Sequence, residues 1–204
     1  MIEMYDLTGK VAVVIGGGGY LCSEIARGLA LAKAEVIILD LRIDKAKKAA
    51  ETINLKTPNQ CDYYSVDVTD IESLKTARES IIKIHKRVDI LINGAGINDP
   101  TPFLEIDLEN WQKVIDSQIT GTMLACQVFG SLMLSQASGS IINFSSASAG
   151  PPLSKAFAYS VAKAGIKNLT MNLAREWGKT GVRVNAIRPG FFPTEWNKKN
   201  FITK

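Results

Sequence analysis

Three residues in the last third of the chain, Ser146, Tyr159 and Lys163, have the side-chain types and the spacing for proton transfer. Tyr159 and Lys163 are four residues apart in a predicted helix, so their side chains leave the same face one turn apart. A tyrosine that titrates near ~10 needs about 4 kcal/mol of extra anion stabilisation to work near pH ~7. An ammonium about 4 Å away supplies roughly that much at an effective dielectric constant of about 20. We therefore expect Lys163 to lower the pKa of Tyr159, unless the two are merely helix neighbours.

Short apolar runs alternate along the chain with longer helical stretches, as in parallel sheets joined by crossover helices. Continuously hydrophobic strands are typical of a sheet that helices cover on both faces. The sequence therefore predicts one α/β domain over residues 1–204, a Rossmann-type doubly wound parallel sheet. Ligands of such sheets bind beyond the carboxyl ends of the strands. We expect strands at 11–15, 36–39, 62–66, 89–92, 140–144 and 182–187, and helices at 21–33, 44–54, 71–86, 119–135 and 157–178.

Composition excludes several classes of protein. With 204 residues, 46% of them hydrophobic, the chain suits one globular core. Its apolar runs are far shorter than the ~20 residues that cross a bilayer, and its N-terminus lacks a secretory signal pattern, so we expect a cytoplasmic protein. The net charge is +4, and the sequence contains no run of five like charges, which argues against a protein that binds nucleic acid. Three widely spaced cysteines and a single histidine, His85, expected on a helix surface, argue against a metal site.

A glycine-rich turn, GGGGYLC at 16–22, follows the first predicted strand and opens a helix. Free amides at a helix N-terminus favour a pyrophosphate and glycines let the backbone approach it, although tight turns also use glycine. Asp40 ends the second predicted strand, where a carboxylate can bind both hydroxyls of an adenosine ribose. Its charge would repel a 2′-phosphate, so the sequence favours NAD over NADP. Arg42, two residues later, could soften that preference.

Together with NGAG at 93–96 and PGFFPT at 189–194, these motifs resemble the short-chain dehydrogenase/reductase family over essentially the whole chain. The resemblance implies hydride transfer between a nicotinamide and the substrate. In it Ser146 polarises the alcohol or carbonyl, Tyr159 exchanges the proton, and Lys163 assists Tyr159 and binds ribose. The further positions that the resemblance assigns to the cofactor are Gly16, Gly18, Gly19, Tyr20, Leu21, Asp40, Asp67, Val68, Asn93, Ala95, Gly96, Lys163, Pro189, Gly190, Phe192 and Thr194.

The sequence departs from the family pattern in its glycine turn, middle helix and C-terminus. Ile15, Tyr20 and Cys22 replace a threonine and two glycines of the usual turn, so we expect a reshaped cofactor site with Cys22 small enough for close packing. Gln118 stands where the family has an asparagine that anchors a proton-relay water, and it joins the predicted catalytic group. Family members usually continue beyond PGxxxT into a lid and a last strand. We therefore expect this chain to be C-terminally short, either incomplete or part of a longer protein.

More narrowly, GGGGYLCSEIA, NGAGIN and RPGFFPTEWN resemble the branch containing gluconate 5-dehydrogenase-like and mannonate oxidoreductase-like enzymes, which act on sugar acids. The residues expected beside the substrate, Asn98, Ser148 and Trp196, are mostly polar. A polar wall suits a polyhydroxylated small molecule, a sugar acid or polyol, better than a steroid or acyl chain. Nearby cations could meet a carboxylate or could simply be solvated: Lys155, Arg188 and Lys198.

Two other functions remain open at this point. A reductase for another ketone class, such as an acyl thioester, would require an apolar pocket beyond Ser148. A non-catalytic nucleotide-binding protein would account for the departures at Tyr20, Cys22 and Gln118, although it would not require the serine, tyrosine and lysine together. Because helices at 119–135 and 157–178 form a dimer surface in the family, we expect a homodimer, and a tetramer only if a C-terminal tail exists.

Overall fold

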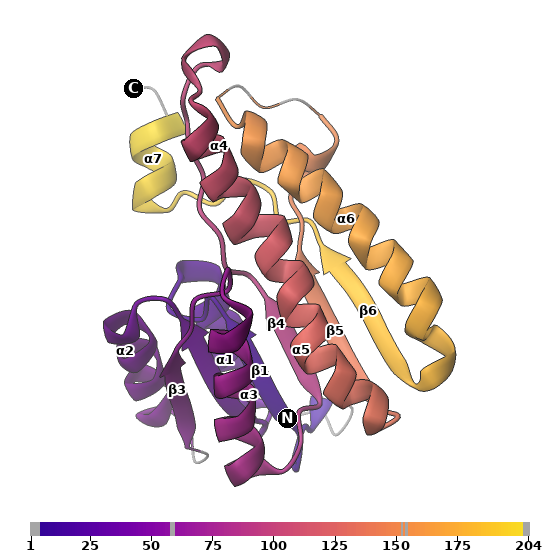
Figure 1. The fold of residues 1–204 in the computed structure, drawn as a ribbon. Coiled ribbons are helices and arrows are strands. Elements are labelled where there is room, and N and C mark those ends of the chain that lie inside the picture. Colours follow the sequence, from indigo (N-terminus) through magenta and orange to yellow (C-terminus); the bar gives the residue numbers. More distant parts are fainter. Residues whose placement is uncertain (1–4, 58–59, 152, 154, 202–204) are drawn as a thin grey trace.

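The fold is built on a parallel sheet, seen in a computed structural model that describes residues 5–57, 60–151, 153 and 155–201 (Figure 1). The described sheet has six strands in the order β3-β2-β1-β4-β5-β6. All the predicted strands are present, each within one residue of its expected bounds. They are β1 (Val11–Ile15), β2 (Glu35–Asp40), β3 (Cys61–Ser65), β4 (Ile90–Asn93), β5 (Gly139–Phe144) and β6 (Val182–Ile187).

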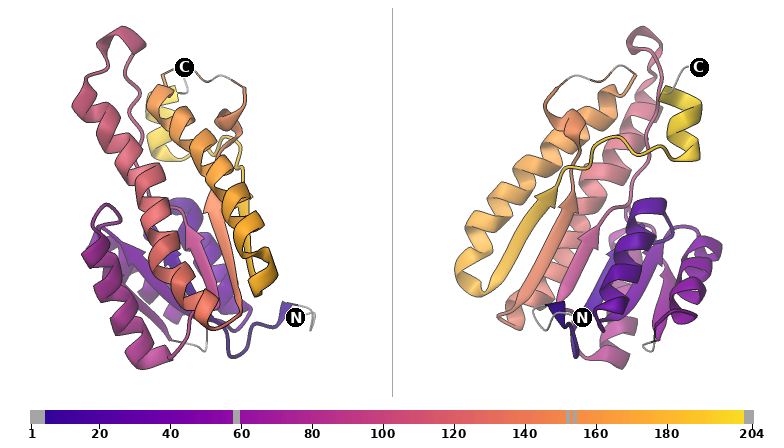
Figure 2. Two further views of the ribbon diagram at one scale, coloured as in Figure 1. Left: turned by 45° about the vertical axis from the view of Figure 1, so that its right-hand side comes forward. Right: turned by 180° about the vertical axis from the view of Figure 1, so that it is seen from behind.

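Helices cover the two faces of this sheet in two layers (Figure 2). On one face lie α1 (Tyr20–Leu31) and α2 (Ile43–Asn54). On the other lie α3 (Ile71–His85), α5 (Gly121–Ser135) and α6 (Phe157–Trp177). Along β1 the side chains alternate: Val11 and Val13 join the core under α3 and α5, and Val14 joins the core under α1 and α2. The sheet is therefore buried on both sides in its centre, as its hydrophobic strands predict.

The middle helix starts earlier than the sequence predicted and is interrupted. Asp107 caps the start of α4 (Leu108–Ile115), and its carboxylate accepts the N–H of Asn110 at 2.8 Å. One π-helical turn, Asp116–Thr120, then leads into α5. Such turns alter the path of a helix and are frequent at functional sites. The expected helix at 119–135 was thus only its second half, and Gln118 lies in the irregular turn.

His85 is not the exposed helix residue that the sequence predicted. Its side chain is only 8% exposed, and its two ring nitrogens lie 2.7 Å from Glu35 Oε2 and 3.1 Å from Asp62 Oδ2. Both acids stand at the amino ends of their strands. The cluster therefore lies at the end of the sheet opposite the carboxyl ends, where ligands of such sheets bind. The prediction was wrong because helical periodicity does not reveal which side chains a neighbouring strand brings to the helix.

Two kinds of feature are absent from the part of the chain that the structure describes. None of its helices combines the length and the apolarity that a bilayer crossing requires. No cluster of histidine, cysteine, aspartate and glutamate in the same residues could hold a metal ion. β6 is the last strand at one edge of the described sheet, and the chain then runs on to α7 (Glu195–Phe201).

Candidate active site

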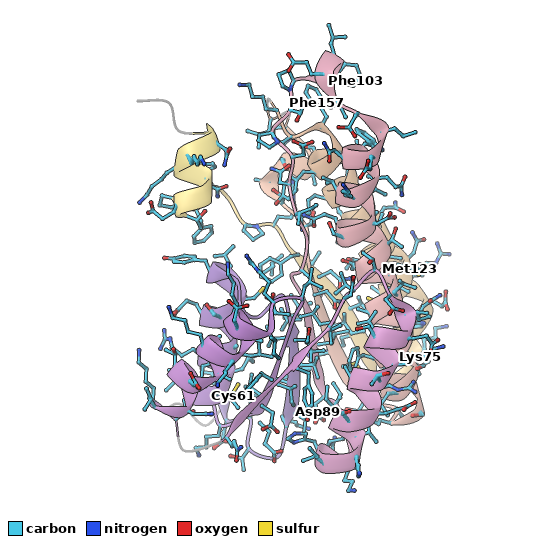
Figure 3. All side chains as sticks on the ribbon, turned by 60° about the vertical axis from the view of Figure 1, so that its left-hand side comes forward. Cys61, Lys75, Asp89, Phe103, Met123 and Phe157 are labelled. Atoms are coloured by element: carbon cyan, nitrogen blue, oxygen red, sulfur yellow. The ribbon has the colours of Figure 1, made fainter. Side chains whose placement is uncertain are left out.

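A cleft of about 1100 Å³ lies beyond the carboxyl ends of the strands and is joined by a smaller cavity of about 270 Å³. The strand order reverses between β1 and β4, which is where open sheets of this type bind ligands. Phe103 and Phe157 pack at the same end, with ring centroids 5.1 Å apart, far from Asp89 at the opposite end of the sheet (Figure 3). The cleft therefore has the position that the topology predicts.

Ser146, Tyr159 and Lys163 come together at this end of the sheet. Ser146 follows β5, and its Oγ accepts the N–H of Ser148 at 3.2 Å, so it caps the short 3₁₀ turn η4 (Ala147–Ala149). Tyr159 lies in the first turn of α6 and is hydrogen-bonded to Ser146. Lys163 follows one turn later, is 5% exposed, and donates to the carbonyl oxygen of Phe144 at 2.6 Å. Ser146 and Tyr159 thus interact directly, and Nζ of Lys163 lies over the Tyr159 ring, 5.4 Å from its centre.

The electrostatics of this group differ from the sequence expectation. Burial raises the pKa of Tyr159, and the hydrogen bond from Ser146 opposes that rise. Burial also lowers the pKa of Lys163 to about 8. The ammonium lies 5.4 Å from the centre of the Tyr159 ring and is held by Phe144. Lys163 does not contribute to the shift of the Tyr159 pKa, so the expected lowering by Lys163 is not present in this structure, where the cation faces the ring and donates to the carbonyl oxygen of Phe144.

Gln118 contributes an amide oxygen that has no hydrogen-bond partner. The side chain is 2% exposed, and its Nε2 donates to the carbonyl oxygen of Ile97 at 2.8 Å, which fixes the orientation of the amide. The other atom, Oε1, is buried and unpaired. A Cβ added to Gly96 would lie 2.3 Å from the amide carbon, so the amide lies directly against that glycine. Because Gln118 lines both cavities, a donor from a ligand or water could satisfy it.

The glycine turn and Asp40 shape the nucleotide end of the cleft. Gly16 has a φ of +75°, and a Cβ there would lie 2.7 Å from the amide nitrogen of Ala95, so only glycine suits the position. The carboxylate of Asp40 accepts the N–H of Gly18 at 3.1 Å and that of Arg42 at 3.0 Å. Its two oxygens are therefore held in fixed positions where the side chain lines the cleft.

Cys22 acts as a packing group in the reshaped turn. It is 3% exposed, and a Cβ added to Gly94 would lie only 2.2 Å from its sulfur. Burial raises the pKa of the Cys22 thiol to about 12, so the thiol stays protonated near neutral pH. The expectation that this cysteine is small enough for close packing is confirmed, and the close contact requires glycine at position 94.

Most of the predicted site residues line the two cavities, with two exceptions among those described. Gly18 lines neither cavity but binds Asp40 through its N–H. Asn93 also lines neither, because its side chain turns into the core and donates to Asn143 Oδ1 at 2.8 Å. The side chain of Trp196 lies outside the described part of the structure. The lining residues among those predicted are Gly16, Gly19, Tyr20, Leu21, Asp40, Asp67, Val68, Ala95, Gly96, Asn98, Gln118, Ser146, Ser148, Tyr159, Lys163, Pro189, Gly190, Phe192 and Thr194.

The cations that line the cleft are not the three suggested by the sequence. Lys155, Arg188 and Lys198 line neither cavity. Lys113 of α4 lines the larger one, and its Nζ lies 2.5 Å from Glu109 Oε1. Sequence reasoning missed Lys113 because it did not predict α4. The signal available in the sequence was Asp107, a typical N-cap residue, which would have extended the helix to Leu108 and so included Lys113.

A scan against protein families matches residues 10–204 to a family described as short chain dehydrogenase. The chain belongs to the short-chain dehydrogenase/reductase family. It is therefore an oxidoreductase of a family whose solved members include structures with bound NAD and with bound NADP. The resemblance inferred from the motifs is confirmed.

Relatives within the family include enzymes of sugars and polyols. The chain is 41% identical to the uncharacterized oxidoreductase UxuB of Bacillus subtilis (strain 168), over 97% of this chain and 76% of that protein. It is 33% identical to the D-threitol dehydrogenase of Mycolicibacterium smegmatis, over 96% and 75%. A structure of a proposed D-mannonate oxidoreductase from Haemophilus influenza, with bound NAD, is 37% identical and superposes with a TM-score of 0.88 over 94% of this chain and 74% of that one.

Proposed function

We propose that this oxidoreductase uses NAD(H) to interconvert a secondary alcohol and a ketone of a sugar acid or polyol. The observation that carries the proposal is the grouping of Ser146, Tyr159 and Lys163 at one cavity, with Ser146 and Tyr159 also lining the cleft that has Asp40 at its nucleotide end. The sugar and polyol names of its relatives support the substrate class. Residues 1–204 would form a single catalytic domain in this reading.

The proton steps fall to the side chains of this chain. Tyr159 takes the hydroxyl proton in oxidation and returns it in reduction, and Ser146 holds the same oxygen through its hydroxyl. Lys163, whose Nζ lies 5.4 Å from the centre of the tyrosine ring, would bind the ribose of the cofactor. Gln118, with its unpaired Oε1, would hold the relay water. Bound nicotinamide supplies the hydride chemistry, which the protein side chains cannot perform.

The residues of the nucleotide end fit a dinucleotide. Gly16 and Gly19 leave the backbone uncovered at the start of α1, where free N–H groups and the helix dipole favour a pyrophosphate. Asp40 keeps acceptor capacity beyond its two backbone partners, which suits ribose hydroxyls. We propose NAD as the preferred cofactor, because a fixed carboxylate at this position repels a 2′-phosphate.

The substrate end carries several polar side chains, which suit a hydroxylated substrate, within a cleft whose wall is apolar over most of its area. Asn98, Ser148 and Asn197 line the larger cleft beside Tyr159. One buried oxygen of Asn98 has no partner, so it could take a hydrogen bond from a substrate hydroxyl or, if the amide is turned over, give one. Ile97, Leu153 and Phe191 contribute to the apolar part of the wall. We propose that these residues face the carbon chain and hydroxyls of the substrate.

Binding and turnover test this proposal together. NAD and NADP are titrated into the protein by calorimetry, and reduction of the cofactor is followed by absorbance with a panel of sugar acids, polyols and simple secondary alcohols. We expect tighter binding of NAD and the highest kcat/KM with a sugar acid or polyol. Turnover confined to acyl thioesters would contradict the substrate class, and absence of nucleotide binding would contradict the enzymatic function.

We also propose that the protein forms a homodimer through α5 and α6. Val161 and Met171 of α6 are 54% and 61% exposed, which is high for large apolar side chains within a helix. Sedimentation of the wild type should give a dimer. A Val161→Glu, Met171→Glu double variant should sediment as a monomer, and a monomeric wild type would contradict the assignment.

A further inference from the structure

Arg188 holds the turn that carries Ser146. It follows the last residue of β6 and reaches across to the end of β5, where its Nε donates to the carbonyl oxygen of Ser146 at 3.2 Å. Its Nη2 donates to the carbonyl oxygen of Ala147, also at 3.2 Å. These same carbonyls close the η4 turn by accepting the N–H groups of Ala149 at 3.1 Å and Gly150 at 3.4 Å. The guanidinium fork therefore contacts both carbonyls on which the turn depends.

The backbone alone attaches this turn at only a few points. Ser145 donates to the carbonyl oxygen of Ile187 and Ala147 donates to that of Pro189, each at 3.0 Å. In the peptide between Ser146 and Ala147, the N–H is thus held by Pro189, and the carbonyl oxygen is held by the turn itself and by Arg188. Because hydrogen bonds from charged donors are stronger than neutral ones, loss of the fork should loosen this peptide more than loss of an ordinary side-chain contact.

Arg188 does not have the position of a substrate-binding cation. It lines neither cavity, and its guanidinium is engaged by two backbone carbonyls. A displacement of the turn would instead act through Ser146, whose hydroxyl contacts Tyr159. We propose that Arg188 is a positioning residue that clamps the η4 turn and so keeps the Ser146 hydroxyl against Tyr159. Its kinetic consequence rests on the proposed function, whereas its structural consequence does not.

The chain offers a matched control for Arg188 within β6, the strand that Arg188 follows. Arg183 of β6 also donates through its guanidinium, at 3.1 Å to Ser140 Oγ, but at the opposite end of the strand pair. We would compare Arg188→Met with Arg183→Met, and add Arg188→Lys, which keeps the charge but cannot form the fork. Far-ultraviolet circular dichroism and thermal unfolding would check that each variant folds.

Hydrogen exchange of a peptide covering residues 145–151, followed by mass spectrometry, tests the clamp without any need for turnover. In Arg188→Met the amides of Ala149 and Gly150 should exchange about tenfold faster, because a hydrogen bond from a charged donor typically changes an opening equilibrium by about that factor. Arg188→Lys should lie between this variant and the wild type, and Arg183→Met should match the wild type. Equal exchange in Arg188→Met and Arg183→Met would overturn the proposal.

The pH dependence of alcohol oxidation tests whether the clamp acts through Ser146. The hydrogen bond from Ser146 lowers the pKa of Tyr159, so a displaced hydroxyl should move the rising limb of the kcat profile upward by up to about one pH unit. The other titratable groups near this pair, Lys163 and Cys22, are unchanged in every variant. We expect the shift in Arg188→Met with little change in the Kd for NAD. If Arg188→Met is active and its amides exchange faster, but its kcat profile does not shift with pH, the positioning role would be overturned. A wild type without turnover would contradict the proposed function, and the exchange comparison would still decide whether the clamp exists.

Discussion

Replacing Lys163 with methionine should make the protein more stable at neutral pH while removing its activity. Lys163 is 5% exposed, and burial lowers its pKa from 10.5 to about 8. A lowered lysine pKa means that the folded state disfavours the charged form, so below about pH 8 the fold carries the cost of the buried ammonium. Methionine has a similar length and no charge, and it therefore removes that cost.

The size of the effect follows from the two pKa values. The difference between 10.5 and about 8 corresponds to about 3 kcal/mol at pH 7. Methionine also leaves the carbonyl oxygen of Phe144 without its 2.6 Å donor, which costs about 1–3 kcal/mol. The net gain at pH 7 is therefore about 1 kcal/mol. The cost of the buried charge is present in full below about pH 8 and fades as the pH rises towards 10.5, and about 2 kcal/mol of it is relieved by pH ~9.5.

Urea unfolding of both proteins at pH 7 and pH ~9.5 measures this difference. The neighbouring ionisable groups do not confound it, since burial raises the pKa values of Tyr159 and Cys22 above their ordinary values and both remain in the variant. The wild type should gain about 2 kcal/mol relative to Lys163→Met between the two pH values. The reasoning would be refuted if the difference in unfolding free energy between the two proteins did not change with pH. A fall in wild-type stability relative to the variant as the pH rises would refute it as well.

Two further changes test the nucleotide end and the reshaped turn. Asp40→Ala removes the carboxylate that faces the cleft. The cofactor preference, measured as the ratio of kcat/KM for NAD to that for NADP, should therefore shift towards NADP by about tenfold or more. An unchanged ratio would exclude Asp40 from cofactor selection. Gly94→Ala places a Cβ 2.2 Å from the sulfur of Cys22 and should destabilise the fold by about 1–3 kcal/mol in thermal unfolding. Adding Cys22→Ala should recover most of that loss, and additive losses in the double variant would show that the two positions do not interact.

The sequence was sufficient for the positions and the parallel arrangement of the strands, because short apolar runs such as β1 and β2 alternate with helical stretches. The hydrophobic pattern did not predict α4, where Leu108 is 79% exposed and the helix is bounded by a polar cap and a π-helical turn. Without α4, the sequence could not place Lys113 in the cleft. Short amphipathic helices of this kind depend on tertiary packing, which a pattern in one chain segment does not record.

The site was predicted in its residues but not in its electrostatics. Spacing placed Tyr159 and Lys163 on one face of a helix, and they lie there. Spacing could not show that Lys163 is bound by Phe144 from β5, nor that burial dominates the pKa of Tyr159. The role of Arg188 was equally hidden, because its partners are backbone carbonyls of the turn after β5 and carry no sequence signature.

The most direct test of the proposed mechanism is a comparison of the wild type with Tyr159→Phe. The substitution removes only the phenolic oxygen, which is hydrogen-bonded to Ser146 at the cleft. NAD affinity is measured by calorimetry and turnover by cofactor absorbance, with the best substrate found in the panel. The account predicts that NAD binding changes by less than about threefold while kcat falls by at least about a hundredfold, as expected for loss of a general acid and base. Turnover within about tenfold of the wild type would show that Tyr159 does not transfer the proton.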